Sequence, residues 1–210
     1  MKKIGIIGSG EVGKTLAKGL TKHGYDIMLG TEDGAKRDSF KKESGIKTGS
    51  FNETATFGEI VILAVKGSAA EKVIGSISAK IIGKTVIDTS NPIADKPPVN
   101  GVLQFFTTLD NSLLERLQKV VPDAHLVKAF SCVGSSFMID PDFSQKPSMF
   151  ICGNNDKAKK DVSAILEKAG WETEDMGSAE AARAIEPLCM LWCIPGFLRN
   201  DWTHAFRVQR

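Results

Sequence analysis

The sequence predicts an α/β protein with a doubly wound, mainly parallel sheet. Short, continuous apolar runs such as Ile60–Val65 (IVILAV) alternate with amphipathic stretches, as expected for strands that helices cover on both faces. A glycine-rich turn, GSGEVG, follows the first apolar run directly. With 210 residues, 42% of them hydrophobic, the chain is long enough to bury one substantial core.

The predicted elements follow a strand–helix order along most of the chain. Strands are predicted at Ile4–Ile7, Ile27–Leu29, Ile46–Thr48, Ile60–Val65, Thr85–Asp88, His125–Phe130, Met149–Cys152 and Trp171–Met176. Helices are predicted at residues 10–23, ended by Gly24, and at Ser68–Lys80, Ser112–Val120 and Asp156–Ala169. The polar segment between the second and third strands is assigned no element.

The composition changes at Ser178, which divides the chain into a domain at 1–177 and a helical segment at 178–210. The second part is rich in Leu, Met, Trp and Phe and is too apolar for a solitary surface helix. We expect it to pack on the domain or on a second subunit, and we favour a homodimer in which it shapes part of the ligand site.

Charge and cysteine content exclude several classes of function. The chain has 27 basic and 25 acidic residues, a net charge of +2, so it shows no strong field directed at nucleic acid or membrane. We find neither a signal peptide nor a run of about 20 apolar residues, and therefore expect a cytoplasmic protein without membrane contact. The four cysteines are too scattered for a disulfide framework. Cys189 and Cys193 would share a helix face, and we favour buried apolar residues over a metal pair there.

The stretch Gly8–Thr15 (GSGEVGKT) fits two phosphate-binding patterns at once. As G-x-G-x-x-G it is a dinucleotide fingerprint, and as G-x-x-x-x-G-K-T it is a Walker A loop. The two patterns begin the following helix at different places, because a Walker loop wraps the phosphate before the helix begins near its lysine. Thr85–Ser90 (TVIDTS) could serve as a Walker B strand with Asp88 on magnesium, although an aspartate at a strand end commonly caps the next turn.

Helical phase favours the dinucleotide interpretation. Val12, Leu16 and Leu20 recur at every fourth residue, so the helix is already running before Gly13. Lys14 then faces solvent, away from any bound phosphate. The fingerprint glycines are Gly8, Gly10 and Gly13, which places a pyrophosphate at the helix N-terminus and makes the predicted sheet Rossmann-type.

The end of the second strand should face the adenosine ribose, about 20 residues past the glycines. Thr31, Lys36 and Arg37 suit a 2′-phosphate, whereas Glu32 opposes it and suits the free hydroxyls of NAD. The mixture leaves both cofactors open, with NADP favoured.

Seven segments of the sequence together resemble one known family: IGIIGSGEVGKTLAKGL, LGTED, VILAVKGSAAEKVI, VIDTSNPI, HLVKAFSCVGS, FICGNNDKAK and the tail from Ile185. In these motifs the chain resembles the coenzyme F420-dependent NADP oxidoreductase family, which is related to the reductase domain of the STEAP metalloreductases. The resemblance covers most of the chain. It implies an NADP-binding domain with a small C-terminal helical part, and hydride transfer between the nicotinamide and a flavin or F420 (deazaflavin) acceptor.

The resemblance also implies the residues that contact the cofactor. The pyrophosphate loop corresponds to Ser9, Gly10, Glu11 and Val12; the 2′-phosphate contacts to Thr31, Glu32 and Lys36; and the walls of the nicotinamide pocket to Val65, Lys66, Asn91, Pro92, Ala129, Ser131 and Cys132. The family usually has Arg where this chain has Glu32, Pro where it has Lys66, and Asn-Thr where it has Ser131-Cys132. The last two departures lie where the second substrate would approach.

Hydride transfer between two bound heterocycles needs positioning and water exclusion more than acid–base groups. This suits a chain with three histidines, His23, His125 and His204, each of which is more simply explained as structural. Lys66 could contact the cofactor phosphates or an anionic acceptor, and Cys132 is more simply inert lining than a reactive thiol. Two alternatives stay open: a reductase of small imines or hydroxyacids, and a non-catalytic dinucleotide sensor.

Overall fold

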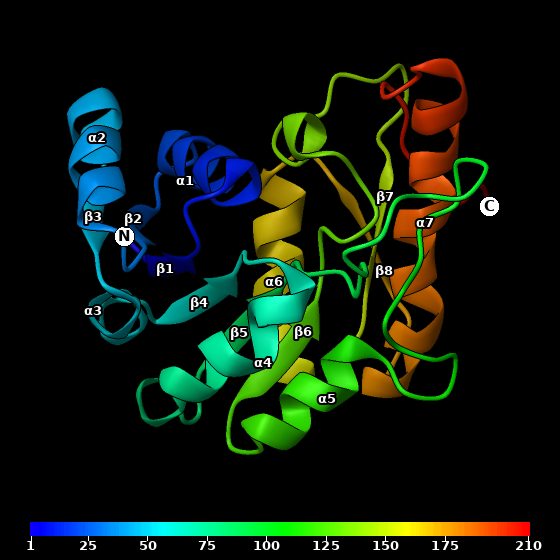
Figure 1. Ribbon diagram of the computed structural model, residues 1–210. Helices are drawn as coiled ribbons and strands as arrows, with labels where there is room; N and C mark the ends of the chain where they lie inside the picture. The colour runs from blue at the N-terminus through cyan, green and yellow to red at the C-terminus, as the bar shows by residue number, and fades with distance from the viewer.

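A six-stranded parallel sheet forms the centre of the computed structural model, which describes all residues from Met1 to Arg210 (Figure 1). The strand order is β3-β2-β1-β4-β5-β6, so the chain starts in the middle and builds the sheet outward in both directions. This is the doubly wound arrangement that the sequence predicts. The strands are β1 (Lys3–Ile7), β2 (Asp26–Gly30), β3 (Lys47–Gly49), β4 (Ile60–Leu63), β5 (Thr85–Asp88) and β6 (His125–Lys128).

Helices cover both faces of this sheet, and each face has its own apolar cluster. One cluster joins the sheet to α1 (Glu11–Lys22), α2 (Gly34–Ser44) and α6 (Asp156–Lys168). The other joins it to α3 (Phe51–Phe57), α4 (Gly67–Ser76) and α5 (Leu113–Val120). Strands covered on both sides explain why β4 and β5 are buried along their whole length.

The last two strands, β7 (Ser148–Ile151) and β8 (Glu172–Asp175), form a separate two-stranded parallel sheet. An isolated antiparallel bridge between Lys128 and Cys152 connects it to the end of β6. The sequence predicts both strands but not their separation from the main sheet, because apolar periodicity carries no information about strand partners.

The helices α2 and α3 correct the sequence prediction, in which neither segment has an element. Only Phe40 of α2 is buried, so the helix has almost no apolar stripe from which it could be recognised. Its signals are local: Asp33 caps the N-terminus, and Gly45 ends the helix with φ +72°. A capping box of Ser50 and Glu53 begins α3. The helix predicted at Ser68–Lys80 is divided into α4 and a 3₁₀ turn, η1 (Ser78–Lys80).

The C-terminal helix α7 (Ala182–Arg199) lies beside β7 and β8 at the β6 end of the molecule, far from the N-terminus (Figure 1). Two short 3₁₀ turns, η2 (Ser135–Phe137) and η3 (Ala179–Ala181), lie before it in the chain. By length and composition alone, Ala179–Arg199 is apolar enough to cross a membrane, with a mean hydropathy of 1.3. Its apolar stretch is interrupted by Arg183 and Glu186, so the criterion of a continuous apolar run does not identify it.

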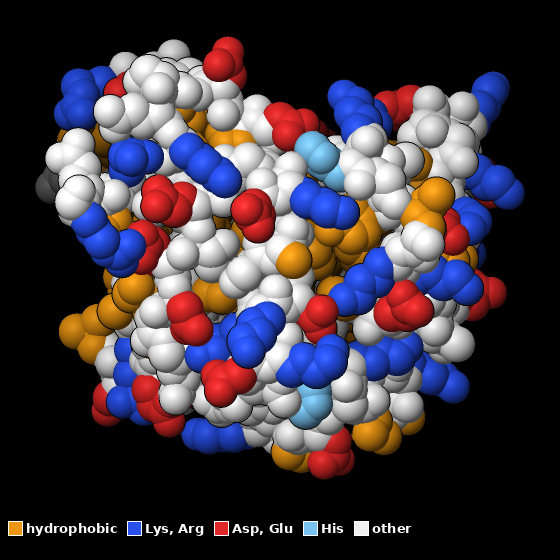
Figure 2. Space-filling model, turned by 180° about the vertical axis from the view of Figure 1, so that it is seen from behind, with side chains coloured by type: hydrophobic (Ala, Val, Ile, Leu, Met, Phe, Trp, Pro, Cys, Tyr) orange, Lys and Arg blue, Asp and Glu red, His pale blue; other side chains and the backbone are white.

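The tail after α7 folds back onto the molecule. Trp192 stacks on His204 with ring centroids 5.0 Å apart, and the Trp192 Nε1–H donates to the His204 carbonyl over 2.8 Å. Further along, the Ser148 N–H donates to the Phe206 carbonyl over 2.9 Å, so the tail lies against β7. On the face shown in Figure 2, Lys and Arg side chains are interspersed with Asp and Glu, in keeping with the net charge of +2.

Candidate functional site

The three glycines between β1 and α1 differ in what a side chain at their position would contact. Gly8 has φ +121°, and a Cβ there would overlap the Ala64 carbonyl. A Cβ on Gly13 would overlap the Gly8 carbonyl, so glycine allows α1 to lie close to its strand. An added Cβ on Gly10 would meet nothing within 4 Å, which leaves the space in front of the turn open.

The helix α1 begins at Glu11, before Gly13, as helical phase predicts. Its first hydrogen bond runs from the Lys14 N–H to the Gly10 carbonyl, and Gly10 provides no side-chain cap. The N–H groups of the first turn therefore have no helical partner and are available to an anion. The Lys14 Nζ lies 3.9 Å from Glu11 Oε1, and its side chain is 40% exposed. It takes no part in the pocket described next, in contrast to a Walker lysine.

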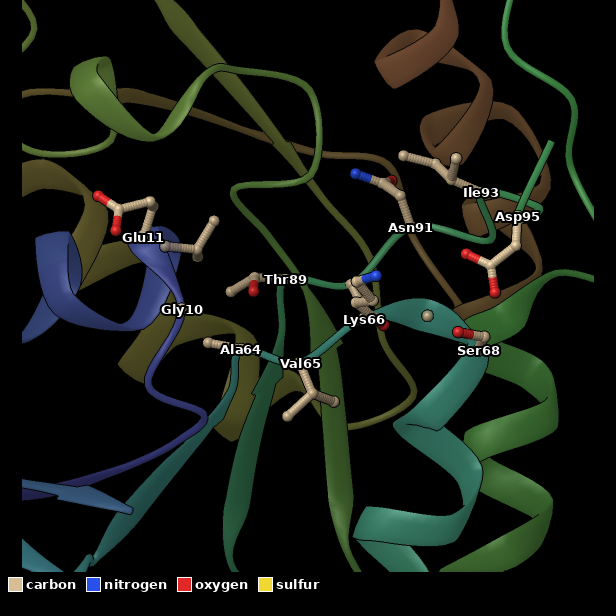
Figure 3. A pocket seen from close by; sticks show the side chains of 13 residues that line it. Gly10, Glu11, Ala64, Val65, Lys66, Ser68, Thr89, Asn91, Ile93 and Asp95 are labelled. Carbon is tan, nitrogen blue, oxygen red and sulfur yellow. The ribbon is translucent and has the colours of Figure 1, made fainter. Parts of the chain in front are cut away.

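A pocket of about 430 Å³ opens at the carboxyl ends of β1, β4 and β5 (Figure 3). This volume lies in the usual range for small-molecule sites, and the location is the one at which open α/β sheets bind ligands. Its walls come from the start of α1, the β4–α4 turn and the segment after β5. The lining residues are Gly10, Glu11, Val12, Ala64, Val65, Lys66, Gly67, Ser68, Thr89, Ser90, Asn91, Ile93 and Asp95.

Six of the residues predicted from the sequence therefore share one pocket: Gly10, Glu11, Val12, Val65, Lys66 and Asn91. Ser9 lies in the same turn, half-buried, one residue before the lining. Lys66 is the exposed N-cap residue of α4 and makes no side-chain cap there. Although strand-end position could have indicated Thr89, sequence reasoning missed the other seven lining residues: Ala64, Gly67, Ser68, Thr89, Ser90, Ile93 and Asp95.

Two buried polar atoms beside this pocket have no hydrogen-bond partner. The Asn91 side chain points toward the loop after β6 (Figure 3), and its Nδ2 donates to the Ser131 carbonyl over 2.8 Å. The Asn91 Oδ1 and the Ser131 Oγ are left unpaired. Buried acceptors are rarely left without a donor, so a group with N–H or O–H donors would suit this corner.

Pro92 and Ala129 support the same corner from behind. The Pro92 carbonyl accepts the Phe106 N–H over 2.9 Å, and the Ala129 N–H donates to the Asp88 carbonyl over 3.1 Å. Both residues are buried, and neither contributes to the pocket lining. The resemblance implies that both residues form the pocket wall, whereas the structure places them outside its lining.

The predicted 2′-phosphate residues gather at a different point, the end of β2. Thr31 is buried, and its Oγ1 accepts the Asp33 N–H over 3.3 Å. The exposed Glu32 turns toward α3, where its Oε1 accepts the Phe51 N–H over 2.8 Å. Lys36 Nζ lies 3.6 Å from Asp33 Oδ2 and is 66% exposed. Arg37 donates to the Thr31 carbonyl over 3.1 Å, so two cations and the carboxylates of Glu32 and Asp33 lie around this strand end.

A feature that sequence reasoning missed lies behind the β5 and β6 ends of the pocket. The Lys128 Nζ lies 2.6 Å from Asp88 Oδ2 and 2.9 Å from Glu186 Oε1, and all three side chains are buried. We call these three residues the buried ion cluster. The sequence HLVKAF could have indicated this cluster, since it places a lysine within an apolar strand. A charge on a buried strand requires partners of opposite charge.

The cluster explains the charge state of Lys128 and the role of Asp88. Burial by itself would lower the pKa of Lys128, but the attraction of Asp88 and Glu186 outweighs it and raises that pKa, so the lysine is charged. Asp88 Oδ1 accepts the Ser90 N–H over 2.9 Å, which is the end-of-strand cap that competed with the Walker B interpretation. Both oxygens of Asp88 thus bind donors of the chain itself.

The thiols and the histidines lie outside the pocket lining. Burial raises the pKa of the Cys132 thiol to about 12, which agrees with an inert role. His23 forms the C-cap of α1, and its Nε2 lies 2.9 Å from Asp140 Oδ1. His125 begins β6, and His204 packs in the tail. No group of three or more His, Cys, Asp or Glu side chains is arranged to hold a metal ion.

Comparison with known proteins shows which proteins this chain resembles. A family model described as NADP oxidoreductase coenzyme F420-dependent matches residues 3–92, which include the glycine turn and Asn91. Over 206 residues the chain is 28% identical to the F420-dependent NADP reductase of Methanocaldococcus jannaschii, with 90% of each chain covered. These matches support the resemblance of the chain to this oxidoreductase family.

Two further matches delimit the relationship. The chain is 28% identical over 200 residues to the metalloreductase STEAP3 of Rattus norvegicus; the match covers 93% of this chain but 39% of that longer protein. A solved structure from Arthrobacter sp. FB24 superposes with a TM-score of 0.92 over 100% of both chains at 24% identity, which confirms the fold. The family match ends at residue 92. It therefore includes the lining residues up to Asn91, but not Ile93 and Asp95.

Proposed function

We propose that this chain transfers hydride between NADP(H) and a flavin- or deazaflavin-type acceptor such as F420. The observation that carries the proposal is one pocket that combines the open N-terminus of α1 with Asn91, whose buried Oδ1 has no hydrogen-bond partner. A dinucleotide has both complementary parts, an anionic pyrophosphate and a carboxamide with N–H donors.

The chain's own residues fit the cofactor at both ends of the pocket. The first-turn N–H groups behind Gly10 would hold the pyrophosphate, and the open space at Gly10 would let it approach the backbone. Asn91 Oδ1 and Ser131 Oγ would accept hydrogen bonds from the carboxamide. When bound, the cofactor supplies the hydride, and the chain supplies binding and orientation.

The lining also fits a reaction that needs little proton transfer. It contains no histidine, and the apolar side chains of Val12, Val65 and Ile93 are placed to exclude water from the reacting faces. The task of these residues is to hold two heterocycles at about 3–3.5 Å from each other in the correct orientation. Hydride transfer from an NADP-type cofactor requires nothing further from the side chains.

We favour NADP over NAD as the cofactor. Thr31, Lys36 and Arg37 surround the end of β2, and Glu32 is already bound to the Phe51 N–H of α3, which draws its carboxylate toward that helix. The F420-dependent NADP reductase of Methanocaldococcus jannaschii, by its description, uses NADP. The residual negative charge of Glu32 still opposes a 2′-phosphate, so the expected preference is modest.

We further propose that residues 178–210 face a second copy of the chain near the acceptor side, and that the protein works in the cytoplasm. Leu191, Phe197 and Leu198 on α7 are 54%, 44% and 55% exposed, which leaves an apolar helix surface without a cover. Lys66, at the rim of the pocket, is the cation available to an acidic group of the acceptor.

Titration of the purified protein with NADPH, NADH and ATP, followed by nicotinamide fluorescence, tests the cofactor. We expect NADPH to bind most tightly, and displacement of NADPH by ATP at low concentration would contradict the proposal. NADPH-loaded protein is then mixed with a deazaflavin, FMN and a ferric chelate. Oxidation by the deazaflavin or FMN supports the proposed reaction, whereas binding without oxidation by any acceptor would identify a dinucleotide sensor.

A further inference from the structure

Ser90, in the pocket wall, is held through all of its polar groups by the buried ion cluster. Its N–H and its Oγ both donate to Asp88 Oδ1, over 2.9 and 2.6 Å. Its carbonyl accepts from the Lys128 Nζ over 2.9 Å. A residue bound at its amide, its hydroxyl and its carbonyl has little freedom in φ or ψ, so the direction of the chain after Ser90 is set by the cluster.

That direction determines where Asn91 lies. Asn91 is the next residue, and its side chain spans from the β5 end to the Ser131 carbonyl after β6 (Figure 3). Asn91 lines the pocket, and its Oδ1 is buried and unpaired. A rotation of the Ser90 peptide would therefore move Oδ1, the atom assigned above to the carboxamide of the nicotinamide.

The other end of the cluster reaches two helices. Glu186 lies on α7, and its two oxygens accept the Leu113 and Leu114 N–H groups at the start of α5, over 2.9 and 3.0 Å. Glu186 Oε1 also lies 2.9 Å from the Lys128 Nζ. The helix on the proposed acceptor side is thus connected through one carboxylate and one ammonium group to the wall on the cofactor side.

From this continuous set of contacts we infer that the buried ion cluster is a positioning device: Glu186 on α7 fixes Lys128, and Lys128 with Asp88 fixes Ser90 and so the nicotinamide-facing Asn91. The inference rests on the proposed function for the identity of the bound ring. It goes beyond that function, because it assigns the orientation of the ring to three residues that touch neither substrate.

A purely structural role for the cluster would predict that any comparable bond between α5 and α7 matters equally. The chain provides such a bond: Arg183 of α7 and Glu115 of α5 are joined over 2.6 Å, and this pair makes no contact with the β5–β6 end. Arg183→Gln is therefore the matched control for Glu186→Gln. Both variants remove a charge from α7 and a contact with α5, but the Glu186 substitution alone also disturbs the Lys128–Ser90 contact.

The experiment measures NADPH affinity and the single-turnover rate of NADPH oxidation by FMN or a deazaflavin in the wild-type chain and both variants. We expect Glu186→Gln to lower the rate at least about tenfold, because small misplacements of reacting groups have large effects on rate, with a dissociation constant changed less than about threefold. Arg183→Gln should retain the wild-type rate. Equal loss in both variants, or a loss entirely in affinity, would overturn the inference.

Amide hydrogen exchange of the same proteins provides a readout that is independent of activity. In Glu186→Gln the amide of Ser90 should exchange at least about tenfold faster relative to β1 and β4, whereas in Arg183→Gln it should not. If Glu186→Gln does not fold, Ser90→Ala removes the Oγ bond alone and should slow turnover in the same direction. If the wild-type chain oxidises no NADPH, the proposed function fails, whereas unchanged exchange at Ser90 overturns the inference alone.

Discussion

The ends of β2 and of β5–β6 lie at the same edge of one sheet, and both carry charged side chains, yet they differ completely in burial. At β2, Glu32 and Lys36 are exposed and make single contacts with nearby backbone or side chains. At β5–β6, Asp88 and Lys128 have no exposed side-chain surface and are bound on all sides. The first group can adjust to a ligand, whereas the second is held in place by its partners.

The difference follows from desolvation. A charge in water loses little when a neighbour is removed, because solvent replaces the interaction. A buried charge has no such replacement, so the loss of one partner leaves the other uncompensated. Substitutions at β2 should therefore change ligand preference, and substitutions at β5–β6 should change stability and geometry. The pair Glu115–Arg183, partly exposed at 15% and 39%, lies between these extremes.

The largest effect is expected for Lys128→Met. The substitution leaves Asp88 and Glu186 buried without a counterion, and the free energy of unfolding should fall by about 3–5 kcal/mol. Urea denaturation followed by circular dichroism measures it. Lys14→Met is the matched control and should change the free energy of unfolding by less than about 0.5 kcal/mol, because that side chain is exposed. Equal stability of the two variants would remove the distinction between the two sheet ends.

A smaller effect is expected for Glu115 as pH falls. Hydrogen bonds from Arg183 outweigh the effect of burial and lower the pKa of Glu115 from 4.5 to about 2 in the folded chain. Since the folded pKa lies below the unfolded one, the stabilisation is complete above about pH 4.5 and is lost as pH falls toward 2. We expect Glu115→Gln to be about 1–2 kcal/mol less stable than wild type at pH 7.

Urea denaturation at pH 7, 4 and 2.5 tests the sign of this dependence. The difference between wild type and Glu115→Gln should shrink steadily toward the lowest pH. Glu59→Gln serves as the control because that carboxylate accepts only the Lys3 N–H over 3.1 Å. A difference between wild type and Glu115→Gln that grows on acidification would contradict the assignment to the Glu115–Arg183 pair.

The smallest effect on stability, and the clearest one on ligand preference, is expected for Glu32→Gln. The amide oxygen can still accept the Phe51 N–H, while the charge that opposes a 2′-phosphate is removed. The ratio of NADPH to NADH affinity should rise by about three- to tenfold, as expected for the loss of one partly screened repulsion. Fluorescence titration of wild type, Glu32→Gln and Glu59→Gln measures this ratio. An unchanged ratio in Glu32→Gln would show that the carboxylate faces α3 alone.

The sequence was most informative where structure depends on neighbours along the chain. The spacing of Val12, Leu16 and Leu20 was enough to predict that α1 begins before Gly13. The alternation of apolar runs was enough to predict a parallel sheet. It was least informative for α2 and α3. Phe40 is the one buried residue of α2, so no stripe marked that helix, and its Asp33 cap and terminal Gly45 were the signals left to find.

For the candidate site, the glycine turn, strand-end position and the family resemblance together were enough to bring Gly10, Lys66 and Asn91 into one predicted site, and the three residues line one pocket. The same reasoning could not detect the buried ion cluster. Asp88 and Lys128 are 40 residues apart, and Leu113 and Glu186 are 73 residues apart. Whether such charges are solvated or buried depends on which elements cover them.

The sequence by itself therefore determined the order of elements, the glycine turn and the phase of its helix, because steric and periodic constraints act over a few residues. Only the tertiary structure decided that Lys128 is buried between two carboxylates, that Asn91 Oδ1 lacks a partner, and that Glu32 turns toward α3. The physical reason is that desolvation and hydrogen bonding depend on the environment of a side chain, which is assembled from distant segments of the chain. A local sequence pattern carries no information about that environment.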